Sequence, residues 1–151
     1  MSEVMQNINE GLAIALCKAW NNLDSSYIEN CIANDFVYSS QMVLSDLKGK
    51  DAFLNYLKAK FKSFKEGVNI VTAELGYYNN KPCIIFKLSL HTPIRSPYGN
   101  PDHQEQSPNH PLVSEVVSTL LMEFENSLIK SAIMCVIPGI SNISRTGVFP
   151  K

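Results

Sequence analysis

The chain has 151 residues, of which 45% are hydrophobic and 18% are charged. This length and composition are typical of one soluble globular domain with a sizeable core, and we expect that domain to span residues 1–151. The net charge of −1 supplies no field that would hold a polyanion. These totals argue against a nucleic-acid-binding protein.

The N-terminal segment and the cysteines indicate the compartment. Residues 1–10 are polar and lack the basic and hydrophobic blocks of a signal peptide, and no apolar run reaches membrane-spanning length. Four widely spaced cysteines lie among apolar residues and form no C-x-x-C pair for zinc or redox chemistry: Cys17, Cys31, Cys83 and Cys135. We therefore expect a reduced, cytoplasmic protein that needs no metal or cofactor and binds no membrane.

Two helices are expected first along the chain. Across Val4–Trp20, apolar residues recur three or four positions apart, which predicts an amphipathic helix. Asp24 or Ser26 can then cap a second, short helix, since Ser26 and Glu29 have the spacing of a capping box.

A strand is predicted next, from Asp35 to Gln41. Phe36, Tyr38 and Ser40 share one face of this strand. Gln41 has the opposite parity, so it reaches the same pocket as Ser40 only if a bulge or the strand end intervenes.

The third expected helix, Lys50–Phe64, carries one charge in the middle of its apolar face. At about 100° per residue, five large side chains fall within one arc: Phe53, Tyr56, Leu57, Phe61 and Phe64. Lys60 falls inside the same arc. Its ammonium group must therefore either reach out to water or meet a partner in a cavity. Gly67 is expected to close this helix.

Two β-hairpins are predicted in the second half of the chain. Their strands are Val68–Leu75 with Pro82–His91, around a turn at Asn79-Asn80, and Val113–Phe124 with Leu128–Ile137, around a turn at Glu125–Ser127. Both faces of these strands are apolar, because Ile84 and Phe86 form one row and Cys83 and Ile85 form the other. Such a sheet needs a cover on each side. Helices can cover one face, and we expect a homodimer to cover the other.

Two stretches show no regular period. Residues 92–111 contain five prolines and few large apolar residues, and we expect a long proline-rich surface loop rather than a domain boundary. Residues 138–151 are expected to form an irregular C-terminal tail that lies along the surface or along a neighbouring subunit.

The order helix, short helix, strand, helix and four antiparallel strands resembles the nuclear transport factor 2-like fold, a cystatin-like α+β cone. The local match comprises Leu23-Asp24, Asp35–Gln41, Gly49-Lys50, Tyr56-Leu57 and Lys60-Phe61, and the resemblance covers roughly Ala13–Ile137. It implies a cone-shaped, curved antiparallel sheet of about four long strands plus a short one, packed against three N-terminal helices. It also implies a pocket inside the cone, and two such sheets commonly pack back to back.

The superfamily also holds ketosteroid isomerases, polyketide (SnoaL-like) cyclases and scytalone dehydratase. In the isomerase branch the catalytic base lies five residues past an aspartate that matches Asp35, and that position is Ser40 here. The two groups that would bind the oxyanion fall near Leu120 and Ile14. A hydroxyl and two aliphatic side chains cannot perform this acid–base chemistry, so the isomerase constellation is absent.

Six residues are predicted ligand contacts around the implied pocket: Trp20, Tyr38, Ser40, Gln41, Tyr56 and Lys60. Lys60 would anchor an anion or transfer a proton. The alternative is a lysine that reaches water or binds a carboxylate such as Asp35. For the two tyrosines and Trp20 the alternative is core packing with each polar atom satisfied.

The histidines offer a weaker hypothesis. His91 ends a predicted strand and is a candidate proton-transfer group at the pocket rim or at the dimer edge. His103 and His110 lie in the proline-rich loop at a spacing that matches no rigid ligand pattern, so no metal site is predicted there.

Three functions remain open. The first is a domain that binds a small organic molecule through Tyr38, Gln41, Tyr56 and Lys60. The second is a cofactor-independent isomerase, cyclase or dehydratase with Lys60 or His91 as the proton-transfer group. The third is a dimerisation or protein-interaction module whose cone is filled by its own side chains. The lack of a recognisable acid–base pair favours the first and third.

Overall fold

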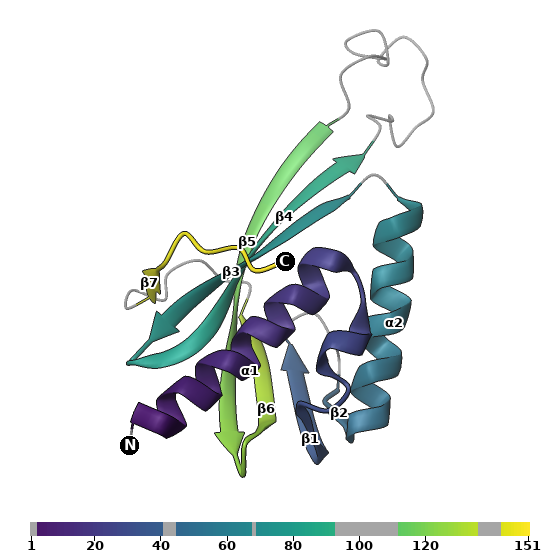
Figure 1. The fold of residues 1–151 in the computed structure, drawn as a ribbon. Coiled ribbons are helices and arrows are strands. Elements are labelled where there is room, and N and C mark those ends of the chain that lie inside the picture. The colour runs from purple at the N-terminus through teal and green to yellow at the C-terminus, as the bar shows by residue number, and fades with distance from the viewer. Residues whose placement is uncertain (1–2, 41–44, 68, 93–111, 136–142) are drawn as a thin grey trace, which may run out of the picture.

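The computed structural model describes residues 3–40, 45–67, 69–92, 112–135 and 143–151. Two α-helices and one short 3-10 helix occur in these ranges, together with seven strands (Figure 1). Their bounds are α1 Glu3–Asn22, η1 Ser25–Ile28, β1 Ile32–Ser40, β2 Leu47–Lys48, α2 Lys50–Glu66, β3 Ile70–Tyr78, β4 Lys81–Thr92, β5 Leu112–Glu125, β6 Leu128–Cys135 and β7 Ile143–Arg145.

The strands form one curved, unclosed sheet in the order β2-β1-β6-β5-β4-β3-β7. This confirms the predicted α+β class with a curved sheet. Two details of the prediction were wrong: β1 pairs with β6 in parallel, and the sheet has seven strands rather than about five. The alternation within β1 predicted a strand but carried no information about its neighbour, which lies about a hundred residues away in the sequence.

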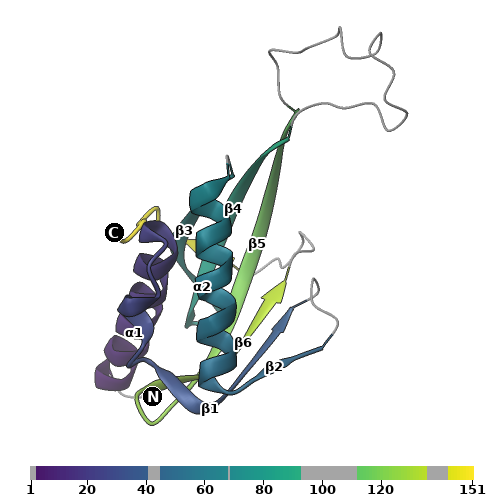
Figure 2. The same ribbon diagram turned by 90° about the vertical axis from the view of Figure 1, so that its right-hand side faces the viewer.

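Both α-helices lie side by side on the concave face of the sheet, where they form the core with it (Figure 2). On α1 the buried positions include Leu12, Leu16 and Trp20, which follow a helical period. On α2 they are Phe53, Leu54, Leu57 and Phe61. The second, short predicted helix is a single 3-10 turn, with the Asp24 carboxylate accepting a hydrogen bond from the Ser26 amide at 2.9 Å.

The turns are built by residues that tolerate positive φ. Asn79 and Asn80 have φ of 50° and 64°, and Asn126 and Ser127 have φ of 55° and 62°. Consecutive positive values match the right-handed twist of hairpin strands, which confirms both predicted turns. Gly49 also has positive φ, at 100°, and its amide donates to the Phe36 carbonyl at 2.7 Å where α2 begins.

The C-terminal segment is more regular than the sequence indicated. Residues 143–145 form β7, which pairs antiparallel with β3 and extends the sheet at that edge. The amide of Leu75 donates to the Val148 carbonyl at 3.0 Å, so the segment continues along β3 beyond β7. The predicted irregular tail is therefore in part an edge strand, and residues 138–142 lie outside the described ranges.

A buried carboxylate holds this segment. Glu74 of β3 is 2% exposed, and its Oε1 accepts from Arg145 Nε at 3.1 Å and Nη2 at 2.6 Å. Its Oε2 accepts from the Gly147 amide at 2.8 Å, where φ is 73°. Burial alone would raise the pKa of Glu74, but these hydrogen bonds and the Arg145 charge lower it below its usual 4.5.

Asn21, near the end of α1, ties the same edge to the helix layer. Its Nδ2 donates to the carbonyls of Ala73 at 2.9 Å and Pro150 at 2.7 Å, and its Oδ1 accepts from the Ala73 amide at 2.8 Å. Backbone groups of β3 that have no strand partner at this edge are thereby satisfied.

None of the helices in the described ranges is both long and apolar enough to cross a membrane. The cytoplasmic location stays a prediction.

We expect Glu74→Gln to lower the free energy of unfolding by about 2 kcal/mol near neutral pH, because the charge-assisted hydrogen bonds to the C-terminal segment are lost. The folded pKa of Glu74 lies below 4.5, so its contribution is present above that pH and is lost as the pH falls through the folded pKa. Urea denaturation at a series of pH values should show that the difference in free energy of unfolding between Glu74→Gln and the wild type shrinks as the pH falls. Glu115→Gln, which removes an exposed carboxylate from β5, is the matched control and should change stability by only a few tenths of a kcal/mol.

Candidate functional site

The burial of side chains on the concave face of the sheet changes from one end of the strands to the other. Toward one end the side chains are fully buried and fill the cone: Phe36, Phe53, Leu57, Leu120 and Ile129. Toward the end from which β4 and β5 project (Figures 1 and 2), side chains on the concave face of the sheet and on α2 are only half-buried. On the sheet they are Ser40, Val71, Leu88, Val116, Ser118 and Met134, and on α2 they are Tyr56 and Phe64. We call these eight residues, with Tyr38 beneath them, the open half of the cone.

Two tyrosines provide the polar groups of the open half. Tyr38 of β1 is 3% exposed, and its ring centroid lies 5.4 Å from that of Tyr56 on α2. The side chains of Tyr56 and Ser40 lie beside the Tyr38 hydroxyl and interact with it. Burial, followed by the Tyr56 side chain, raises the pKa of Tyr38 well above its usual 10, although Ser40 opposes the shift. Tyr38 is therefore a neutral phenol that donates or accepts hydrogen bonds.

Strand parity explains why Tyr38 and Ser40 meet. In the register of β1 against β6, Tyr38 pairs with the buried Ala132 and Ser40 with Met134, so both residues face the helices. The sequence prediction that Tyr38 and Ser40 share a face with Phe36 is confirmed. Gln41 lies outside the described residues.

Lys60 lies at the rim of the open half and is exposed. Its Nζ is 5.6 Å from the centroid of the Tyr56 ring, within cation–π range. This position matches the alternative in which the lysine reaches water across an aromatic surface.

Asp35, the partner considered for that lysine, is directed elsewhere. Its carboxylate binds Lys130 Nζ at 3.3 Å, and its side chain is 73% exposed. The cause is a shift in the register of β1 between Ile32 and Val37, which leaves Asn34 and Asp35 both exposed. The suggested Lys60–Asp35 pair was wrong.

Trp20 contacts a different set of rings. It is 6% exposed and lies edge-on to Phe61 and Phe86, with ring centroids 5.0 and 4.9 Å away. Its placement agrees with the core-packing alternative. His91 pairs through its backbone with Val113, but its side chain lies outside the described part of the chain, as do all of His103 and His110.

Sequence reasoning missed the residues that the other strands contribute to the open half. Ser118 and Met134 face the helices because β5 and β6 pair at one register, with Leu120 opposite Met134. The alternation along β5 was visible in the sequence. Which row would be concave, and which neighbours would flank it, depends on the pairing.

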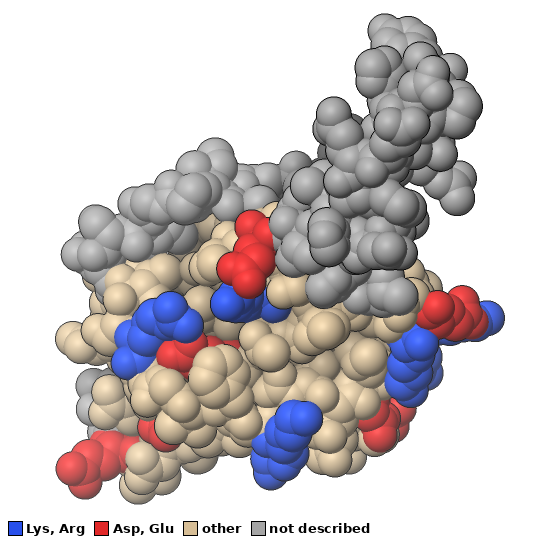
Figure 3. Space-filling view, turned by 90° about the horizontal axis from the view of Figure 1, so that it is seen from above, with Lys and Arg blue, Asp and Glu red and all other residues tan. Residues whose placement is uncertain are grey.

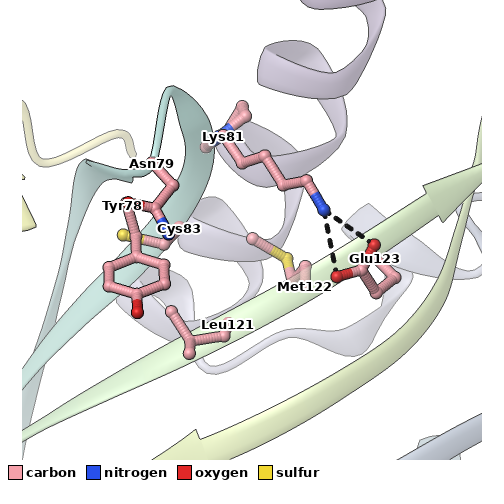
Figure 4. A pocket seen from close by; sticks show the side chains of 8 residues that line it. Tyr78, Asn79, Lys81, Cys83, Leu121, Met122 and Glu123 are labelled. Atoms are coloured by element: carbon pink, nitrogen blue, oxygen red, sulfur yellow. Dashed lines mark hydrogen bonds and ion pairs between the residues drawn. The ribbon is translucent and has the colours of Figure 1, made fainter.

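Another hollow lies at the hairpin end of β3 and β4 (Figure 4). It has a volume of about 210 Å³, and Lys81 reaches across it to Glu123, with Nζ 3.1 and 2.9 Å from the two carboxylate oxygens. Both side chains of this pair are about half exposed or more. Because the pair neutralises its own charges, neither Lys81 nor Glu123 presents an unpaired charge to a ligand in this hollow.

The chemistry available in the described residues is limited to hydrogen bonding and weak acid–base groups. No group of three His, Cys, Asp or Glu side chains in the described ranges is arranged to hold a metal ion. Among the cysteines, Cys17 and Cys83 are buried and free, and burial raises their pKa values to about 12 and about 11. These thiols stay protonated and unreactive at neutral pH.

We compared this architecture with known protein families and solved structures. No protein-family model and no curated protein sequence matches the chain. An NTF2-like protein of unknown function from Mesorhizobium loti superposes with a TM-score of 0.63 at 12% identity, covering 91% of this chain and 97% of that one. A putative SnoaL-like polyketide cyclase from Jannaschia sp. CCS1 gives 0.61 at 9% identity, covering 89% and 88%. A putative polyketide cyclase from Xanthomonas campestris gives 0.57 at 13% identity, covering 85% and 90%.

The chain therefore has the nuclear transport factor 2-like cone fold that the order of its elements predicted. At these identities the likeness establishes the fold and leaves the function to the site.

The buried tyrosine gives the site a measurable pH dependence. Because the folded pKa of Tyr38 is raised above 10, its contribution to stability is fully present below pH 10 and is lost as the pH rises. Between neutral pH and about pH 11, ionisation of Tyr38 in the unfolded chain should lower the stability of the wild type by about 1 kcal/mol. Tyr38→Phe should lack this part of the decline. Urea denaturation over this range measures the decline. Tyr27→Phe, at a 44% exposed position, should leave the decline unchanged, and an equal effect of the two variants would contradict the assignment.

Proposed function

We propose that the open half of the cone binds a small organic molecule that carries a neutral oxygen acceptor or donor, such as a carbonyl or hydroxyl. The observation behind this proposal is that the buried Tyr38 lies against the half-buried Tyr56, beside half-buried apolar side chains. Ligand sites commonly combine an apolar wall with a few fixed polar groups. The fully buried half of the cone leaves no such surface, because aromatic and aliphatic side chains fill it.

The arrangement favours a neutral ligand group next to the tyrosines. Tyr56 and Ser40 lie beside the buried Tyr38, so a ligand oxygen would meet polar groups that the fold has already brought together. Lys60, at the exposed rim, would contact only a part of the ligand that extends into water.

A cofactor-independent cyclase, isomerase or dehydratase is the second candidate. Two of the structural neighbours are putative polyketide cyclases, which supports this second candidate. Such an enzyme needs a proton acceptor beside the bound oxygen. Phe53, Tyr56 and Ser40, which lie against Tyr38, are not proton acceptors, so Lys60 and His91 stay the candidates for that role.

Ligand binding can be tested by thermal denaturation against a panel of small aromatic ketones and phenols. At least one compound class should raise the melting temperature of the wild type, with a smaller rise in Tyr38→Phe and in Tyr56→Phe. Losing one neutral hydrogen bond corresponds to a decrease in affinity of about five- to tenfold. Tyr27→Phe should behave as wild type. No stabilisation by any compound would instead favour the filled-cone interaction module.

We also propose that the outer face of the sheet binds a second copy of the chain. Val117 of β5 and Ile133 of β6 are each 50% exposed on this face. Leu121 is half-buried and pairs with Ile133, and it continues the row that begins at Val117. These three apolar side chains lie on the side away from the helices, and a partner sheet would remove them from water.

The dimer can be tested by size-exclusion chromatography with light scattering. The wild type should elute as a dimer, and Val117→Glu and Ile133→Glu should each shift it toward the monomer, because a buried carboxylate is costly. Val4→Glu introduces the same charge on α1 at a 66% exposed position and should leave the dimer intact. A monomeric wild type, or equal dissociation in all three variants, would rule out this interface.

A further inference from the structure

A second cleft lies between α2 and the turn that joins α1 to η1. It has a volume of about 260 Å³ and is lined by Leu23, Asp24, Ser25, Lys58, Phe61, Lys62 and Lys65. Phe61 is 3% exposed and Leu23 is half-buried, so the floor is apolar and well packed. The three lysines are exposed and form one wall.

Helix geometry explains why the lysines converge. Lys58, Lys62 and Lys65 are spaced four and three residues apart, so they lie within an arc of about 60° on α2. They are spread over about 10 Å along the helix axis. On the same helix Tyr56 lies about 160° from Lys58, so this cleft and the open half of the cone are on opposite sides of α2.

The cleft carries an uncompensated positive charge. Asp24 is the carboxylate among its lining residues, and that group is already hydrogen-bonded by the Ser26 amide. Hydrogen bonds from Ser26, with a contribution from the Lys65 charge, lower the pKa of Asp24. Within the described residues, Lys62 has Glu66 at 4.0 Å, with both side chains largely exposed, and no ion pair within 4.0 Å involves Lys58 or Lys65.

This local charge is not a consequence of composition. The chain has a net charge of −1, and on the face seen in Figure 3 basic and acidic side chains are interspersed. Three ammonium groups meet two carboxylates, Asp24 and the Glu66 that pairs with Lys62, so positive charge is in local excess by one over a concave surface. Like charges held this close on one helix repel each other, and a bound anion would relieve that repulsion.

We propose that this cleft binds a small phosphorylated molecule through its phosphate groups. Lysine ammonium groups bind phosphate as compact point charges. A spread of about 10 Å is wide enough for two phosphoryl groups rather than one. Ser25, which lines the cleft, adds a hydroxyl, and the apolar floor would take the remainder of the molecule. This site is independent of the function proposed for the cone.

The test uses inorganic pyrophosphate as the probe, at low ionic strength, with the full chain. Isothermal titration should give saturable binding, and two-dimensional amide NMR should place the shifts at residues 23–26 and 58–65. In the triple variant Lys58→Gln/Lys62→Gln/Lys65→Gln the affinity should fall by about tenfold, as expected for losing three exposed charge pairs. Replacing the same lysines with arginine retains the charge and should keep most of the affinity.

The matched control is Lys48→Gln/Lys87→Gln/Lys151→Gln, which changes the net charge by the same amount at exposed positions outside the cleft. Its affinity should stay within about twofold of wild type. Equal weakening in the two triple glutamine variants would mean that pyrophosphate responds only to net charge, and would overturn the proposal. Amide shifts spread over other lysines, or no saturable binding to the wild type, would overturn it too. Unchanged circular dichroism confirms that each variant is folded.

Discussion

Trp20 joins the three layers of side chains on which this fold depends. It projects from α1 and lies edge-on to Phe61 of α2 and Phe86 of β4, at centroid distances of 5.0 and 4.9 Å. Edge-to-face contacts of large rings contribute specific geometry as well as buried area. Because one side chain contacts both the other helix and the sheet, it sets the positions of α1 and α2 over the concave face. A ligand inside the cone can therefore contact only the side chains that these rings leave half-buried.

The second helix separates two surfaces of different chemistry. Its core side carries Phe53, Leu57 and Phe61, which pack into the sheet. On one flank the Tyr56 ring lies 5.4 Å from the Tyr38 ring in the open half. On the other flank lysines surround a shallow cleft. An amphipathic helix with a wide apolar stripe has two borders where polar side chains meet buried ones, and both candidate sites of this protein lie at those borders.

The edge strand β3 illustrates how the sheet avoids exposed backbone. A free edge presents unpaired amides and carbonyls, which invite association with other strands. Here β7 covers one part of β3, and the side chain of Asn21 covers the backbone of Ala73. The buried Glu74 carboxylate accepts hydrogen bonds from Arg145 and Gly147, so closure of the edge depends on an ionised group within the fold. The outer face, by contrast, keeps Val117 and Ile133 in contact with water.

The local periodicity of the sequence determined much of the secondary structure of this protein. The two α-helices, the strands β1 and β3 to β6, the Asn79-Asn80 turn and the shared face of Tyr38 and Ser40 follow from spacing between residues close in sequence. At that range the backbone alone dictates which side chains share a face. Only the tertiary structure decided which strands are neighbours. It placed β1 parallel to β6, added β7 to β3, and turned Asp35 toward Lys130 and away from Lys60. Those outcomes depend on contacts between residues far apart in the chain, and a one-residue change in register would reverse which side chains line the cone.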